Sequence, residues 1–307
     1  MDARERVLVT INTDDILEAL GWDAGPTLSG RAARHPVRRA ARLAARGPAF
    51  IFAREIRVFD DDVALRGVRR AARSLLRRFV RRCDINGAEG IPPRGPVLIL
   101  SNHPGITDTL ALLAAIPRAD LKILAADRPF LRAVPAAARS LIFITERREQ
   151  RVAAVRQAID HLSSGGALLT FPAGEIEPDP AVLPGAVESL TRWGPSALLF
   201  LRRVPETTVV PVVVSGVLAP GAQRHPLTLL RPKGPDRERL AAMLQVVAHT
   251  LFPPIWRVDV TVDLLPPLSG QALSEQGDSA MAAITARVRT HLGEQASPGR
   301  SVRGRRR

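Results

Sequence analysis

The sequence predicts an α/β protein, in which a mixed, mostly parallel sheet is flanked by helices and preceded by a basic helical region. From residue 97 onward, short aliphatic segments alternate with helix-length segments. The hydrophobic fraction of 46% over 307 residues suits a large folded core. We therefore expect three parts: a basic helical extension (1–85), an α/β domain (86–292) and a disordered basic tail (293–307).

The first part contains the pattern of a basic amphipathic helix. The preceding run Asp60-Asp61-Asp62 predicts its N-terminus, because carboxylates are favoured there by the helix dipole. Such a helix can lie on an anionic membrane surface or pack its apolar stripe on the core. The two are compatible, because a docked helix can leave its arginine flank facing lipid, and both stay open. The apolar positions at helical spacing are Leu65, Val68, Ala72, Leu75, Leu76 and Phe79, with Arg66, Arg69, Arg70, Arg73, Arg77, Arg78, Arg81 and Arg82 between and beside them.

The second part contains the predicted strands and helices of the sheet. Pro211 lies inside one strand and predicts an edge position or a bulge there. The predicted strands are Val97–Leu100, Lys122–Ala125, Leu141–Thr145, Ala167–Phe171, Val209–Ser215 and the alternating Val258–Val262. The predicted helices are Thr109–Ile116, Arg148–Leu162, Val187–Leu201, Asp236–Phe252 and Ser279–Leu292.

The charge of the chain restricts its partners. The formal net charge is +14, almost wholly from arginine, since Lys122 and Lys233 are the only lysines. Compositional bias is one explanation, and the other is a polyanionic partner such as nucleic acid, an anionic membrane surface or an acidic carrier protein. The first residues are charged where a secretion signal would be apolar, so we expect no secretion signal. No apolar run reaches about 20 residues, so we expect no membrane-spanning helix.

Cysteine and histidine usage argues against two further classes of protein. The single cysteine, Cys83, excludes an internal disulfide, and no histidine has companions at metal-ligand spacing, so we expect no metal site. A Gly-x-Ser-x-Gly elbow and a Gly-Lys phosphate loop are both missing from the sequence, which disfavours serine hydrolases and nucleotide triphosphatases.

The stretch Asn102-His103-Pro104-Gly105-Ile106-Thr107-Asp108 contains the candidate catalytic residues. It follows a predicted strand, so it should lie at the end of the sheet, where α/β proteins commonly bind ligands. On a regular helix a spacing of five residues would keep His103 and Asp108 apart. The Pro-Gly turn lets the chain fold back, so that Asp108 can accept a hydrogen bond from His103. His103 would then be a general base whose other ring nitrogen faces a hydroxyl.

Three later segments complete a resemblance to a known family. Following Asn102, His103 and Asp108, the chain has Ile142–Arg147, then Phe171-Pro172-Ala173-Gly174-Glu175, then Val210-Pro211-Val212. In this order the segments resemble the motifs of the glycerophospholipid acyltransferase family, of the lysophosphatidate acyltransferase type, over about residues 86–220. The resemblance implies a glycerolipid-acyltransferase-like fold and makes 86–292 the acyltransferase domain.

The resemblance also implies a reaction and its participants. His103, oriented by Asp108, would deprotonate the hydroxyl of a lysophospholipid-like acceptor, such as 1-acylglycerol-3-phosphate. The hydroxyl oxygen would then attack the thioester of acyl-CoA or of acyl-acyl carrier protein. No bound cofactor is implied. Arg147, or Arg148 if the alignment shifts by one, would hold an acceptor phosphate. The enzyme would work in the cytoplasm, peripherally at the inner face of the cell membrane, without a nucleic-acid partner.

The third motif departs from the family pattern. The family has glutamate after Phe171-Pro172, where this chain has Ala173, and the residues after Gly174 are Glu175 and Ile176 instead of threonine and arginine. Glu175 is therefore expected to take over acceptor positioning, together with Phe171, Pro172 and Gly174, and the alternative is that Glu175 is simply exposed at a turn. The loss of the arginine opens the possibility of a different acceptor head group. Two other functions stay open: an acyl thioesterase and a non-enzymatic nucleic-acid-binding protein.

Overall fold

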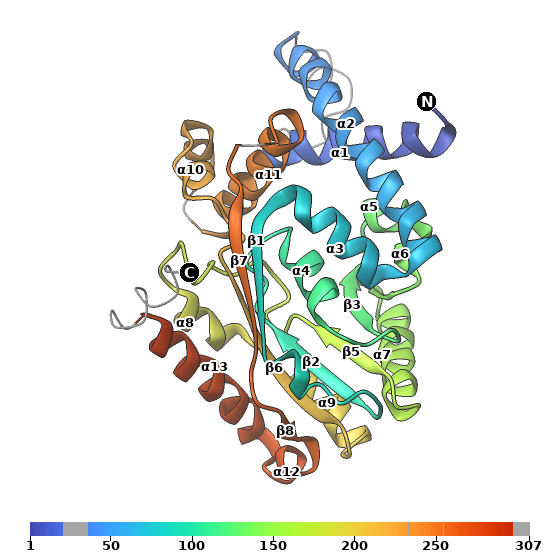
Figure 1. The fold of residues 1–307 in the computed structure, drawn as a ribbon, viewed down its shortest axis with the longest axis vertical. Helices are drawn as coiled ribbons and strands as arrows, with labels where there is room; N and C mark the ends of the chain where they lie inside the picture. The colour runs from blue at the N-terminus through green and yellow to red at the C-terminus, as the bar shows by residue number, and fades with distance from the viewer. Residues whose placement is uncertain (21–35, 233, 254, 297–307) are drawn as a thin grey trace.

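The fold is built on one mixed sheet. The computed structural model describes residues 1–20, 36–232, 234–253 and 255–296 (Figure 1). Within them, the sheet has eight strands in the order β1-β7-β6-β2-β5-β3-β4, and β8 pairs with β6. The strands are β1 (Val80–Asn86), β2 (Val97–Ser101), β3 (Lys122–Ala126), β4 (Leu141–Ile144), β5 (Ala167–Thr170), β6 (Thr208–Ser215), β7 (Val258–Leu264) and β8 (Leu268–Ser269).

The direction of the strands confirms the predicted fold class. β6, β2, β5, β3 and β4 are parallel, and β1 is parallel to β7, whereas β7 and β8 run antiparallel to β6. The sheet is thus mixed and mostly parallel. All six predicted strands are present. β1 was not expected, and the boundary predicted at residues 85 and 86 falls inside it. A register shift between Val80 and Arg82 breaks the two-residue period of its apolar residues, so the sequence shows no clear strand pattern there.

Pro211 does not mark an edge, which corrects the prediction made from the sequence. β6 lies inside the sheet between β7 and β2. The carbonyl of Pro211 accepts a hydrogen bond from Leu265 N, just past the last residue of β7. Since N–H and C=O of a strand residue point to the same side, the missing N–H faces the point where β7 ends. The proline therefore removes a hydrogen bond that the sheet does not need there.

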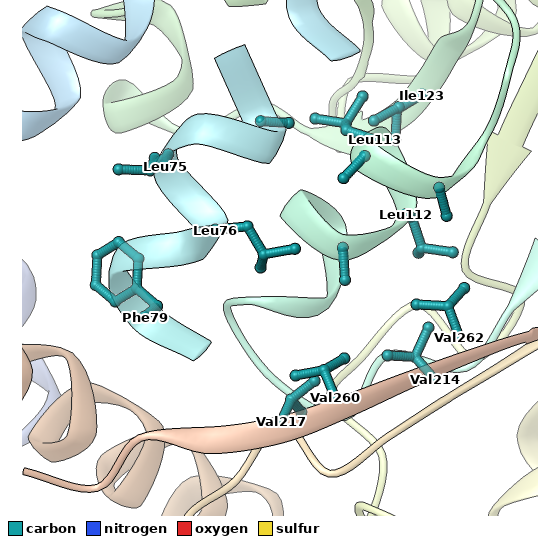
Figure 2. Close-up of a cluster of buried hydrophobic side chains, with 14 of the residues drawn as sticks. Leu75, Leu76, Phe79, Leu112, Leu113, Ile123, Val214, Val217, Val260 and Val262 are labelled. Carbon is teal, nitrogen blue, oxygen red and sulfur yellow. The ribbon is translucent and has the colours of Figure 1, made fainter. Parts of the chain in front are cut away.

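Helices cover both faces of the sheet and bury a hydrophobic cluster on each. Figure 2 shows part of the first cluster, where Leu76 of α3 and Leu112 of α4 lie above Val214 and Val262 of the sheet. The elements on this face include α1 (Ala3–Ala19), α2 (Pro36–Arg66), α3 (Val68–Phe79), α4 (Asp108–Ala115), α10 (Pro220–Gln223) and α11 (Pro235–Leu251). On the other face are α7 (Arg148–Ser163), α9 (Ser196–Arg203), α12 (Gly270–Glu275) and α13 (Ala280–Ala296).

The apolar stripe predicted for the basic helix is buried in the core. α3 buries Ala72, Leu75, Leu76 and Phe79, and it packs against α4. Packing on the core is therefore observed, and contact of the arginine flank with a membrane stays a prediction. Leu65 is an exception, since it belongs to the end of α2 and is 83% exposed.

The aspartate run does not begin a helix, so that prediction was wrong. Residues 60–62 lie inside α2, and the break before α3 is at Gly67, which has a φ of +83°. Asp60 is buried. It pairs with Arg4 of α1 and accepts hydrogen bonds from Ala136 N and Ala137 N, at the start of the short helix α6 (Pro135–Ala138). Its carboxylate thus serves tertiary contacts that local sequence does not reveal.

Two C-terminal predictions also need correction. The helix predicted over Val187–Leu201 is divided into α8 (Ala186–Ser189), a 3₁₀ turn at Leu190–Arg192 and α9, because Gly194 and Pro195 interrupt it. α13 continues to Ala296, so the predicted tail at 293 starts inside a helix, and 297–307 lie outside the described residues. None of the described helices is both long enough and apolar enough to cross a bilayer.

Candidate active site

The candidate site lies at the carboxyl end of β2, in the middle of the sheet. Asn102, the first residue after the strand, uses its side-chain amide as a substitute peptide group. Its Nδ2 donates to the Val214 carbonyl at 2.9 Å, and its Oδ1 accepts from Val214 N at 2.8 Å. This pair of hydrogen bonds holds the start of the turn against β6 and so fixes the backbone position of His103.

His103 and Asp108 lie together across the turn, as the sequence predicts. His103 Nδ1 is 2.6 Å from Asp108 Oδ2, and the Asp108 side chain is fully buried. Gly105 N also donates to Asp108 Oδ2, at 3.2 Å. A Cβ at Gly105 would lie only 3.2 Å from Val217, so the close approach of the turn to the chain after β6 favours glycine.

The other ring nitrogen of His103 is available for chemistry. The His103 side chain is 28% exposed, and Nε2 makes no hydrogen bond within the part of the chain that the structure describes. Because Nδ1 faces a buried carboxylate, the neutral ring keeps its proton on Nδ1 and leaves Nε2 as a proton acceptor. This is the arrangement that a general base requires.

Two carboxylates raise the pKa of His103. Burial disfavours the imidazolium and on its own would lower the pKa. The charge and hydrogen bond of Asp108, with a contribution from the Glu177 carboxylate, outweigh burial and leave the His103 pKa above its ordinary value. The imidazolium formed when the base accepts a proton is therefore stabilised by its surroundings.

The segment after β5 packs against the ring. Phe171 stacks on His103, with ring centroids 4.4 Å apart and planes 25° apart. Pro172 is buried, and Gly174 has a φ of +69°, which L-residues rarely adopt. β2 and β5 are adjacent and parallel, so their carboxyl ends bring the two motifs together.

Glu177 is a buried residue of the site that the sequence analysis missed. Its Oε2 accepts a hydrogen bond from His103 N at 3.0 Å, and its own N–H donates to the His103 carbonyl at 2.9 Å. Its Oε1 accepts from Ser189 Oγ at 3.0 Å and Trp193 Nε1 at 2.9 Å. Burial raises the pKa of Glu177, although these hydrogen bonds lower it in part. Glu177 thus holds the backbone of His103 from the neighbouring loop.

Asp179 holds the other side of the same loop. Its fully buried carboxylate accepts hydrogen bonds from Gly216 N at 2.8 Å and Leu218 N at 2.9 Å, in the turn after β6. Burial raises the pKa of Asp179, partly offset by the backbone donors. Glu177 and Asp179 alternate with prolines, and this spacing of carboxylates just after Phe171-Pro172 is the sequence signal that could have identified them.

The residues expected to bind the acceptor are placed differently. Glu175 is exposed and forms an ion pair with Arg192 at 3.1 Å, without a contact to His103 among the described interactions. Arg147 is exposed at the carboxyl end of β4, the edge strand, and its side chain makes no hydrogen bond or ion pair to the described residues. Arg148, the first residue of α7, is also exposed. All three lie at the same end of the parallel strands as His103 but do not form one cluster with it.

Comparisons with known proteins indicate a family for the segment that contains the site. Residues 82–215, which contain all four motifs, match the family model described as Acyltransferase. This match agrees with the resemblance indicated by the motifs.

Comparisons over the whole chain give less information than the family model. The chain is similar to the solved 1-acyl-sn-glycerophosphate (LPA) acyltransferase PlsC from Thermotoga maritima, with 17% identity and a TM-score of 0.45 over 96% of this chain and 94% of that chain. A likeness at this level carries no conclusion about substrates. The search of curated proteins found no match.

Proposed function

We propose that the protein is an O-acyltransferase that moves a fatty acyl group from acyl-CoA or an acyl-carrier protein to the hydroxyl of a lysophospholipid-like acceptor. The observation that carries the proposal is the His103–Asp108 pair with its available Nε2, inside an acyltransferase-family domain. The family match supports acyl transfer, while the acceptor, the donor and the mechanism are proposals.

In the proposed reaction His103 acts as the general base. Nε2 removes the proton of the acceptor hydroxyl as the oxygen attacks the thioester carbonyl carbon. The tetrahedral intermediate then expels the thiolate, which takes the proton from the imidazolium, so an ester forms as the thioester bond breaks. Asp108 stabilises the imidazolium throughout. General-base catalysis of this kind typically supplies about 10²–10⁴ in rate.

The developing oxyanion needs hydrogen-bond donors close to the imidazole. The backbone N–H groups of Ile106 and Thr107 make no hydrogen bond to the described residues, and they belong to the same turn as His103. We assign them this role. Phe171 would keep the ring in place by stacking, and Glu177 would hold its backbone.

The acceptor would bind at the carboxyl ends of the parallel strands. Arg147 is exposed and has no partner among the described residues, which supports a role in binding a phosphate or another acidic head group. Glu175 forms an ion pair with Arg192. Its carboxylate would contact a hydroxyl or amine group of the acceptor. These assignments make a phosphate-bearing or amino-acid-bearing lysolipid the proposed acceptor class.

The proposal includes a peripheral location at the anionic inner face of the cell membrane. The support is the arginine content of the chain, its net charge of +14 and the amphiphilic acceptor and membrane-lipid product that the reaction implies. Phospholipid biosynthesis or remodelling is the process in which such a reaction belongs.

A test of the function must separate transfer from hydrolysis. The protein is incubated with a radiolabelled acyl-CoA or acyl-carrier protein, with and without each of a panel of lysolipids, and the labelled products are separated. We expect label in a diacyl lipid only when a suitable lysolipid is present. Labelled free fatty acid as the main product, whether or not a lysolipid is added, would make the protein a thioesterase instead.

A further inference from the structure

A groove lined by arginines lies between α1 and α2, apart from the His103 site. It has a volume of about 510 Å³, and no residue of the candidate active site lines it. Arg6, Arg39, Arg42 and Arg46 are among the residues that line it, and no acidic residue is among its described lining residues. Although Arg42 is paired with Asp14, the arginine charges around the groove create a field that attracts a polyvalent anion.

Two of these arginines have no partner in the described part of the chain. Arg42 pairs with Asp14 at 2.7 Å, and Arg6 donates to the Met1 carbonyl at 3.1 Å. Arg39 and Arg46, in contrast, make no hydrogen bond or ion pair to the described residues, and both are exposed. Guanidinium forks match the oxygens of a phosphate group, so this pair suits a phosphate monoester or diester.

The rim of the groove continues into an apolar face of α2. Leu43 lines the groove and is 71% exposed. Further along the helix Phe50, Ile51 and Val58 are also exposed, and their spacing of seven, eight and fifteen residues from Leu43 keeps them on one face. α3 differs, since its apolar stripe is buried in the core.

Together these features match one kind of ligand. An apolar helix face beside a cationic groove is the arrangement of an element that lies in the headgroup region of a bilayer. We propose that the α1–α2 groove binds the phosphate group of an anionic phospholipid, with the exposed face of α2 against the lipid. The inference concerns binding only and does not depend on the proposed reaction.

The test compares two variants that lose the same charge. Arg39→Gln/Arg46→Gln empties the groove of its unpaired arginines. Arg156→Gln/Arg203→Gln removes two exposed arginines of α7 and α9, on the opposite face of the sheet, that also make no hydrogen bond or ion pair to the described residues. Full-length proteins are sedimented with phosphatidylcholine vesicles that contain or lack phosphatidic acid, and circular dichroism checks that both variants are folded.

We expect the wild type to bind the phosphatidic-acid vesicles, and the groove variant to bind them about thirtyfold more weakly. The control variant should lose less than threefold. An equal loss in the two variants would mean that only net charge matters, and it would overturn the site. Equal binding of the wild type to both kinds of vesicle would overturn it as well.

Inorganic phosphate separates a lipid site from a site for a small phosphate compound. Binding of phosphate to the wild type is measured by calorimetry at up to millimolar concentration. We expect no saturable binding, because the apolar face of α2 has nothing to contact. Micromolar binding of inorganic phosphate that Arg39→Gln/Arg46→Gln abolishes would overturn the assignment to a lipid.

Discussion

Two pairs of a histidine and a buried aspartate occur among the described residues, and their surroundings differ. His103 and Asp108 belong to one turn at the end of β2. His291 of α13 and Asp263 of β7 meet through Nε2 and Oδ2 at 3.0 Å. Asp263 also accepts hydrogen bonds from Asn86 and Gln295, both at 2.7 Å.

This difference separates a pair suited to chemistry from a pair that holds elements together. Asp263 joins β7 to β1 and α13 through three side chains, and Gln295 also contacts the bonded nitrogen of His291. At His103 the carboxylate binds Nδ1, while the ring stacks on Phe171 and keeps Nε2 available at the end of a strand. A histidine next to an aspartate is thus not in itself a sign of catalysis, and the groups around the ring decide its role.

The largest effect should come from removing each imidazole in turn. His103→Gln should lower the rate of acyl transfer by about 10²–10⁴, because no general base remains. His291→Gln should leave it within about twofold. Initial rates with saturating thioester and lysolipid measure both, with urea unfolding as a check of the fold. Similar losses in the two variants would remove the distinction between the pairs.

A second comparison uses two neighbouring glutamates. In Glu177→Gln one of the two carboxylate oxygens is replaced by an NH₂ group. That group would face a hydrogen-bond donor, either His103 N or the Ser189 and Trp193 side chains. We expect kcat to fall about 10- to 100-fold as His103 shifts. Glu175→Gln should instead raise the KM for the acceptor, with kcat nearly unchanged. A KM effect alone in Glu177→Gln would show that it does not position the base.

The smallest effect on activity should be seen for Asp263→Asn. Losing this carboxylate leaves its donors poorly paired and should lower the free energy of unfolding by about 1–3 kcal/mol, with activity retained below the unfolding temperature. Burial would raise the pKa of Asp263, but hydrogen bonds from His291, Asn86 and Gln295 outweigh it and lower the pKa.

The lowered pKa of Asp263 sets the pH range in which wild type and Asp263→Asn differ in stability. The stabilisation is present above the unfolded-state pKa of about 4, and it is lost as the pH falls through the folded-state value. The gap in urea stability between wild type and Asp263→Asn should therefore narrow below about pH 4. A constant gap down to pH 2 would contradict the assignment.

The sequence could predict the features that depend on nearby residues. The turn that joins His103 to Asp108 spans five positions, and the alternation of aliphatic and helical segments indicates the sheet. The contact of Glu177 with His103 spans 74 positions, so local patterns could not reveal it. The same reason explains Asp60, whose partners come from α1 and α6, and Pro211, which is tolerated because of where β7 ends. Leu65 was misassigned because Gly67 ends α2 after it.

The central claim is that His103, with its pKa raised by Asp108, is the general base, and the pH profile of kcat/KM tests it most directly. The base must be neutral, so the wild-type rate should fall on the acid side with an apparent pKa above the ordinary value of about 6.5. In Asp108→Asn the attraction is lost while burial remains, so the acid limb should move to lower pH as the rate falls. An acid limb at the same pH in both proteins would contradict the account.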